Sequence, residues 1–115
     1  IGRNMTNKSA SVKQEKRVAK RLKGKQTFLS GGGKFEKGDV LTEKFFIEAK
    51  TRATAQSSIT VKKVWIKKAE DQAFAMGKEN FAIALNFDPN GETYYVINER
   101  LMQQLNEFLN QEESR

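Results

Sequence analysis

Two carboxylates and one ammonium occur within a short stretch of this chain, at Asp39, Glu48 and Lys50. Residues 44–51 alternate in character and are rich in Phe and Ile, which predicts a strand. Because side chains alternate faces along a strand, Phe46, Glu48 and Lys50 would share one face. This Glu-x-Lys pair either belongs to a catalytic site or forms a surface ion pair at a solvated strand edge.

Asp39 opens another predicted strand, over residues 39–41, directly after Gly38. If the short connection 42–43 lets the two strands pair, Asp39 comes near Glu48. Two neighbouring carboxylates repel each other unless one is protonated or a cation lies between them, and a hard divalent ion is the usual partner. The pattern favours an oxygen-ligated metal site, with a plain turn role for Asp39 as the alternative.

The composition narrows this chemistry further. The chain has no cysteine and no histidine, which excludes a disulfide, a Ser-His-Asp triad and a His-ligated zinc site. Oxygen ligands favour Mg²⁺, with Mn²⁺ as a substitute. No apolar run approaches the roughly 20 residues of a membrane helix, and the first ten residues lack a secretory signal. We therefore expect a cytoplasmic protein with no membrane partner.

Two more charged residues fall on apolar helix faces. At 100° per residue, Glu15 lies in the middle of the apolar stripe of a helix predicted over 11–23. A carboxylate that faces a core is costly unless it is paired or binds a metal. Glu15 is therefore a candidate site residue, or else a rim residue whose stem packs. Lys62 lies inside the stripe of a helix predicted over 59–76, where it would reach Glu48 or snorkel at the edge of the core.

The elements that must position these groups follow one another in the order α-β-β-β-α-β-β-α. This order predicts an α/β or α+β fold, with a mixed sheet flanked by helices. We expect one domain over 11–110, preceded by a disordered segment 1–10, of which 1–4 is a tag remnant before a natural start at Met5, and followed by a polar tail 111–115. The predicted helices cover residues 11–23, 59–76 and 98–109, and the predicted strands cover 27–29, 39–41, 44–51, 81–86 and 93–97.

The positive charge is concentrated in the first part of the chain. The formal net charge is +7, but residues 1–68 hold 18 Lys or Arg and 5 Asp or Glu, whereas residues 69–115 hold 3 and 9. A strongly basic surface predicts binding to nucleic acid; a solubilising surface is the alternative.

The ordered set of Glu15, Asp39, Glu48 and Lys50 resembles the PD-(D/E)xK nuclease superfamily. The Pro that usually precedes the Asp is Gly38 here. The loop that begins with Ser30 and continues through three glycines is similar to the serine-glycine loop of archaeal-type Holliday junction resolvases, including their phage-encoded members. The likeness covers roughly residues 11–97 and implies a restriction-endonuclease-like core.

The resemblance also implies a reaction, the hydrolysis of DNA phosphodiesters at four-way junctions. Asp39 and Glu48 would hold Mg²⁺, with the carbonyl of Ala49 as a further ligand, and Glu15 would complete or orient the metal site. Lys50 would position or activate water, or stabilise charge on the phosphate. Ser30 would contact the scissile phosphate or support the site.

DNA and a second copy are the expected partners, and no small-molecule cofactor is expected. Resolvases of this kind act as dimers, because a four-way junction needs two matched cuts. The last helix offers an apolar face that either forms the dimer or packs on its own sheet; this face consists of Leu101, Met102, Leu105, Phe108 and Leu109. The predicted contacts with the DNA backbone are Lys13, Lys16, Arg17, Lys20, Arg21, Lys34 and Lys37.

Three other functions fit parts of the same pattern. The chain could be another PD-(D/E)xK nuclease, of the restriction or repair type. It could be a non-catalytic DNA-binding module on the nuclease fold, although such a module would be expected to have lost one of the acids. A basic RNA-binding protein is the third, and no aromatic-rich strand resembles a stacking platform for single strands.

Overall fold

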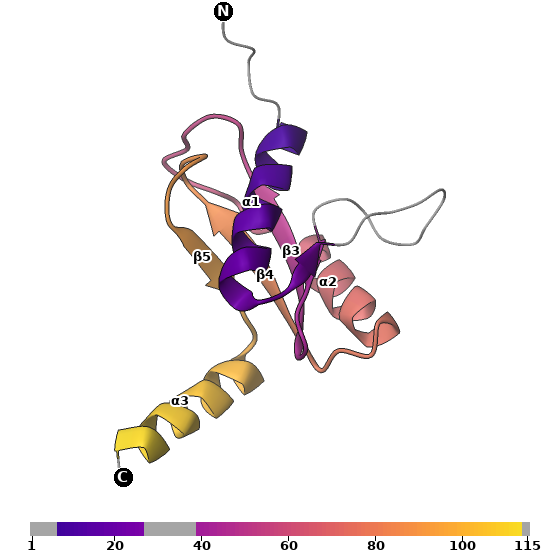
Figure 1. Cartoon of the computed structure of the whole chain (residues 1–115), viewed down its shortest axis with the longest axis vertical. Coiled ribbons are helices and arrows are strands. Elements are labelled where there is room, and N and C mark those ends of the chain that lie inside the picture. The colour runs from indigo at the N-terminus through magenta and orange to yellow at the C-terminus, as the bar shows by residue number, and fades with distance from the viewer. Residues whose placement is uncertain (1–6, 27–38, 114–115) are drawn as a thin grey trace, which may run out of the picture.

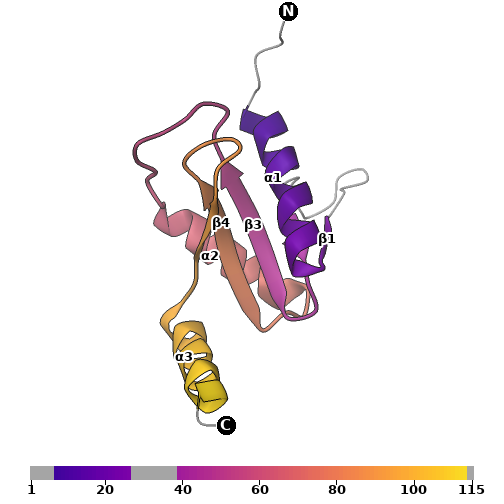
Figure 2. The same cartoon turned by 60° about the vertical axis from the view of Figure 1, so that its left-hand side comes forward.

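A mixed five-stranded sheet lies at the centre of the computed structural model, with α1 over one face and α2 over the other (Figures 1 and 2). The structure describes residues 7–26 and 39–113. The predicted α+β class and the order of elements are confirmed. The elements are α1 (Asn7–Leu22), β1 (Lys25–Gln26), β2 (Asp39–Leu41), β3 (Phe45–Thr51), α2 (Lys63–Ala75), β4 (Asn80–Asn86), β5 (Thr93–Val96) and α3 (Glu99–Glu113).

The strands follow one another across the sheet in the order β1-β2-β3-β4-β5. Only β3 and β4 are parallel, and α2 connects them; the other neighbours are antiparallel. Every residue of β4 is buried, as expected for a strand that is covered on both faces. The positions of β3 and β4 are therefore fixed by packing from both sides.

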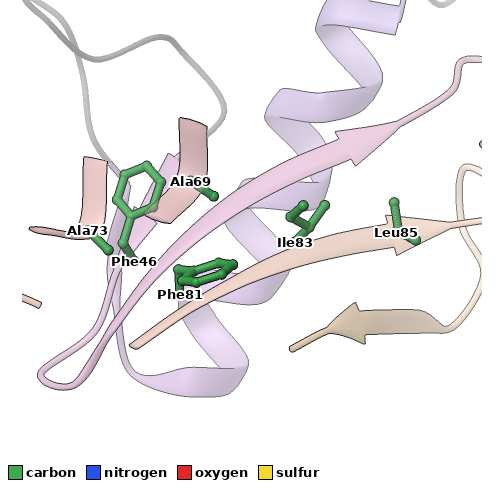
Figure 3. Close-up of a cluster of buried hydrophobic side chains, with 6 residues drawn as sticks. All are labelled: Phe46, Ala69, Ala73, Phe81, Ile83 and Leu85. Carbon is green, nitrogen blue, oxygen red and sulfur yellow. The ribbon is translucent and has the colours of Figure 1, made fainter. Parts of the chain in front are cut away.

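Two apolar clusters separate the faces of the sheet. On the α2 face, Phe46 packs with Ala69 and Ala73 of α2 and with alternate residues of β4 (Figure 3). On the α1 face, Val18 packs against Val40 and Ile47. Because Phe46 belongs to the first cluster and Ile47 to the second, β3 presents successive side chains to opposite faces.

Helix α1 begins at Asn7 rather than at residue 11, so residues 7–10 are helical and not part of a disordered segment. Ala10 is buried, which explains the extension. The helix ends as predicted near Gly24, whose backbone N–H donates to the carbonyl of Ala19 over 2.8 Å. A Cβ at Gly24 would lie 2.6 Å from the carbonyl oxygen of Leu41, so the close approach of β2 requires glycine there.

Helix α2 begins at Lys63, four residues later than predicted. Ile59 and Val61 pack against the core from a segment before the helix that has no regular secondary structure, so their apolar spacing does not mark a helical turn. Lys62, expected inside the helix, is its N-cap residue with an extended backbone (φ −82°, ψ 138°). The predicted helix end at Gly77 is confirmed, since Gly77 has a φ of +70° just after α2.

The last helix extends away from the sheet (Figures 1 and 2). Asn98 caps it as predicted, with its side-chain oxygen accepting the backbone N–H of Leu101 over 2.9 Å. Helix α3 continues to Glu113, so the first residues of the predicted polar tail are helical. The interpretation in which α3 packs on its own sheet is wrong for this structure, because Met102, Leu105, Phe108 and Leu109 are exposed.

The strand predicted over 27–29 lies outside the described residues, and β1 comes just before it. Within the described ranges, no helix is long and apolar enough to cross a membrane.

Candidate active site

Asp39 and Glu48 are directly opposite each other in the antiparallel pair of β2 and β3. Side chains at directly opposite positions lie on the same face, with Cβ atoms roughly 4.5–5.5 Å apart. Both residues are buried, with 1% of Asp39 and 4% of Glu48 exposed. The predicted juxtaposition of two carboxylates is therefore present in the structure, and it is formed by the turn between β2 and β3.

Lys50 completes this group on the α2 face of the sheet. Its Nζ lies 3.3 Å from Oε1 of Glu48 and 4.9 Å from the centre of the Trp65 ring in the first turn of α2. The ring and the carboxylate together hold the ammonium, through cation–π and ionic contacts. The lysine is still partly exposed, with 29% of its side chain accessible. It can therefore contact a substrate at the surface.

The other carboxylate oxygen of Glu48, Oε2, is buried and has no hydrogen-bond partner among the described residues. A buried carboxylate oxygen of this kind is costly unless a donor or a cation satisfies it. Asp39 brings a second acidic side chain to the same place, and the main-chain carbonyl of Ala49 follows Glu48. These oxygen donors fit a hard divalent cation such as Mg²⁺ or Mn²⁺.

Glu15 is buried as predicted, with 3% exposed, but it is on α1, which packs on the face opposite to Glu48 and Lys50. Across residues 7–26 and 39–113, no three acidic side chains gather closely enough to hold one metal ion. The structure therefore brings Asp39 and Glu48 together but does not bring Glu15 into the same cluster.

Lys62 approaches the site from the end of the loop that precedes α2. Its Nζ lies 5.9 Å from the centre of the Trp65 ring, so two ammonium groups, of Lys50 and Lys62, lie near this ring. Nothing in the helical pattern indicated this role for Trp65, which the periodicity placed only in the apolar stripe. The signal that could have found it is its position one turn after Lys62, at the start of a helix that faces a Glu-x-Lys strand.

The serine-glycine loop lies outside the described residues, and with it Ser30, Lys34 and Lys37. Their predicted roles stay predictions.

The basic residues predicted on α1 divide into two groups. Lys13, Lys16, Lys20 and Arg21 are exposed, as DNA contacts require. Arg17 is partly buried instead, and its Nη2 donates to the carbonyl of Pro89 over 2.7 Å. This arginine therefore attaches α1 to the turn between β4 and β5, which is a structural role that the sequence did not predict.

A buried polar network on the α1 face fixes which end of α1 lies near the site. The Gln14 amide donates to the side-chain oxygen of Asn86, and Asn86 is the parallel partner of Thr51 at the end of β3. The first half of α1, with Lys13 and Lys16, therefore lies at the end of the sheet that carries Lys50. Gln14 and Asn86 were missed by the sequence analysis, since single amides have no recognisable spacing.

Comparison of the chain with protein-family models, with curated proteins and with solved structures finds no match. The geometry of Asp39, Glu48 and Lys50 is the feature of the molecule that indicates a function.

Proposed function

We propose that this protein is a metal-dependent DNA endonuclease of the PD-(D/E)xK type, and that its substrate is a four-way DNA junction. The observation that carries the proposal is the buried pair of Asp39 and Glu48, with Lys50 3.3 Å from Glu48. Two neighbouring carboxylates repel each other unless one is protonated or a cation lies between them, and a lysine at the open edge supplies a positive group for a phosphate. The net charge of +7 supports a nucleic-acid substrate.

Asp39, Glu48 and the Ala49 carbonyl would hold the divalent ion. A bound ion of this kind makes water more acidic and offsets negative charge that develops on phosphate oxygens. In the hydrolysis, the water oxygen forms a bond to phosphorus, one P–O ester bond breaks, and the leaving sugar oxygen gains a proton while the water loses one.

The geometry favours one of the two roles expected for Lys50. In its ion pair with Glu48 the lysine is an ammonium, which donates hydrogen bonds but cannot accept a proton. Lys50 therefore fits the stabilisation of charge on the phosphate better than the removal of a proton from water. Trp65 keeps the ammonium at the edge of the site through its ring face.

The decisive experiment is a cleavage assay with Mg²⁺ that compares a synthetic four-way junction with a linear duplex of the same arms. We expect paired, symmetric nicks in the junction alone, and their loss in EDTA. Equal cutting of both DNAs would retain the nuclease and exclude the resolvase. Binding without cutting would favour a non-catalytic DNA-binding module. We further propose that the enzyme acts in the cytoplasm, where such DNA is accessible.

A resolvase needs two copies, and we propose that α3 joins them. Leu101, Leu105 and Phe108 of α3 line a groove of about 790 Å³ between α3, the end of α1 and the sheet. The charged lining residues are Lys23, Lys44 and Glu43, with a net charge of +1, whereas α3 carries Glu99, Glu107 and Glu112. An acidic, amphipathic helix from a second copy complements an apolar groove with basic residues. A symmetric exchange would cover both grooves at once.

The pair of substitutions Leu105→Glu and Phe108→Glu tests this arrangement. We expect a concentration-dependent dimer for the natural chain and a monomer for the double variant in sedimentation velocity. Asn106→Glu adds a charge to an exposed polar position of the same helix and should leave the dimer intact. A natural chain that stays monomeric at all concentrations would exclude this surface.

A further inference from the structure

A second pocket lies beside the candidate active site, in the loop that connects β3 to α2. Its volume is about 340 Å³, which is at the lower end of typical ligand pockets of about 300–1,000 Å³. Its single apolar lining residue is Ile59. The polar lining residues are Arg52, Thr54, Gln56, Ser58, Thr60 and Lys62.

The loop that lines this pocket has no regular secondary structure, and its last residue, Lys62, has an extended backbone. The polar lining residues all have even numbers, whereas Val61 packs against the apolar cluster on the α2 face. Near Lys62, where the backbone is extended, alternate side chains point in opposite directions, so Val61 packs on the core while Thr60 and Lys62 line the pocket. The backbone N–H of Gln56 donates to the carbonyl of Phe87 over 2.7 Å, which fixes the loop to the end of β4.

The pocket is positively charged. Arg52 and Lys62 are in its lining, no acidic residue is, and the chain has no Asp or Glu between Glu48 and Glu70. The N-cap of α2 at Lys62 makes no side-chain hydrogen bond and the first turn has no acid, so the helix end adds a small positive potential. Hydroxyl, amide and guanidinium groups are donors that suit the oxygens of a phosphate.

The pocket adjoins the candidate active site through shared residues. Lys62 lines the pocket, and its Nζ faces the same Trp65 ring as Lys50 does. Arg52 follows Lys50 by two residues, about 6.6 Å of extended chain. Phosphates of one DNA strand rise about 3.4 Å each along the helix axis, and neighbouring ones lie farther apart than this rise because the strand also winds around the axis. Lys50 and Arg52 can thus reach successive phosphates of one strand.

We propose that the pocket lined by Arg52, Thr54, Ser58 and Thr60 binds a backbone phosphate next to the one that is cut. The inference rests on the proposed function for the identity of the DNA strand, but it concerns binding rather than chemistry. Its role is to position the strand, since phosphate contacts fix register without reading sequence.

Binding of a fluorescent four-way junction, measured by anisotropy in EDTA at several salt concentrations, tests this pocket. We expect Arg52→Gln to weaken binding about tenfold and to reduce the slope of log K against log salt by about 0.9. The matched control is Arg100→Gln on α3, where the side chain donates to the Glu79 carbonyl at the start of β4. It makes the same charge change at the other end of the sheet, and we expect less than a twofold effect.

A second variant keeps the charge of the pocket. Ser58→Ala combined with Thr60→Ala removes two hydroxyl donors from exposed positions and should weaken binding about two- to fivefold. Titration with inorganic phosphate, followed by NMR, should shift backbone amides of residues 54–62 in the natural chain and not in Arg52→Gln. Equal affinities and equal salt slopes for Arg52→Gln and Arg100→Gln would overturn the proposal.

The outcomes also separate this inference from the proposed function. If Arg52→Gln loses affinity for the junction while the natural chain cuts no DNA, the phosphate pocket is supported and the nuclease activity is excluded. If the natural chain cuts junctions while Arg52→Gln binds them normally, the nuclease activity is supported and the phosphate pocket is excluded. If inorganic phosphate shifts the backbone amide resonances of the loop while Arg52→Gln leaves the DNA affinity unchanged, the pocket binds a free phosphate and our assignment to DNA is wrong. If the natural chain cuts junctions, Arg52→Gln should raise the KM for the junction and leave kcat within about threefold of the natural value.

Discussion

Both faces of the sheet bury polar side chains, but the buried groups differ in charge. Each face leaves buried oxygens without a hydrogen-bond partner in the described part of the chain, including Oε1 of Gln14 on the α1 face. On the α1 face, the Asn86 amide accepts from Gln14 and Thr93 and donates to the Gly91 carbonyl. On the α2 face, Asp39 and Glu48 place two carboxylates opposite each other, and one buried oxygen of Glu48 has no hydrogen-bond partner in the described part of the chain.

This difference separates a structural polar network from a candidate site. Amide groups are both donors and acceptors, so they can satisfy one another inside the protein. Carboxylates are only acceptors when ionised, so two neighbouring carboxylates repel each other unless one is protonated or a cation lies between them. Burial of polar groups is therefore a weak signal by itself, and the juxtaposition of like charges is the stronger one.

The largest effect expected from this comparison is the loss of cutting in Asp39→Asn and in Glu48→Gln. Each variant removes a charged ligand but keeps the shape of the side chain, so cutting of the junction should fall at least about 10³-fold. DNA affinity in EDTA should stay within about threefold of the natural chain, because neither variant removes a positive charge. Retained cutting in both variants would exclude this site.

Asn86→Ala should have the largest effect on stability. The change leaves the partners of Asn86 without hydrogen bonds inside the protein, at a cost of about 2–4 kcal/mol. Urea unfolding measures this cost, and cutting per folded molecule should be unchanged at low temperature. The control is Asn90→Ala in the exposed turn after β4, which should cost less than about 0.5 kcal/mol. Equal costs for the two changes would mean that the network stabilises little.

Addition of Mg²⁺ should raise the melting temperature, because an ion that binds only the folded chain stabilises it. At an ion concentration 100 times the Kd the gain is about 2.7 kcal/mol, or roughly 10 °C for a domain of this size. The same addition should have little effect on Asp39→Asn. An equal rise in the two proteins would indicate non-specific binding rather than a site at the carboxylate pair.

The smallest predicted effect concerns Lys62. Removing its charge with Lys62→Gln should lower cutting a few-fold, because it weakens the positive potential near Lys50 without removing a metal ligand. Lys63→Gln makes the same change one residue later, in the exposed first turn of α2, and should have a smaller effect. A loss of 10³-fold in Lys62→Gln would instead place Lys62 among the groups that contact the reacting phosphate.

The amino-acid sequence by itself determined the order of the elements, the pairing of Asp39 with Glu48 and the burial of Glu15. Each of these follows from local spacing: a period of two in β3, a short connection between two strands, and 100° per residue along α1. The ends at Gly24 and Gly77 and the cap at Asn98 were predictable for the same reason.

Only the tertiary structure decided which face each helix covers, and this choice kept Glu15 of α1 out of the carboxylate cluster. It also decided that the segment before α2 has no regular secondary structure, which placed Lys62 in a loop and brought Arg52 into the lining of one pocket with Thr54, Ser58 and Thr60. These outcomes depend on contacts between residues far apart in the chain, such as Gln56 with Phe87 and Gln14 with Asn86. Hydrophobic periodicity reports only on residues that are close together in the chain, so the sequence pattern could not predict these contacts.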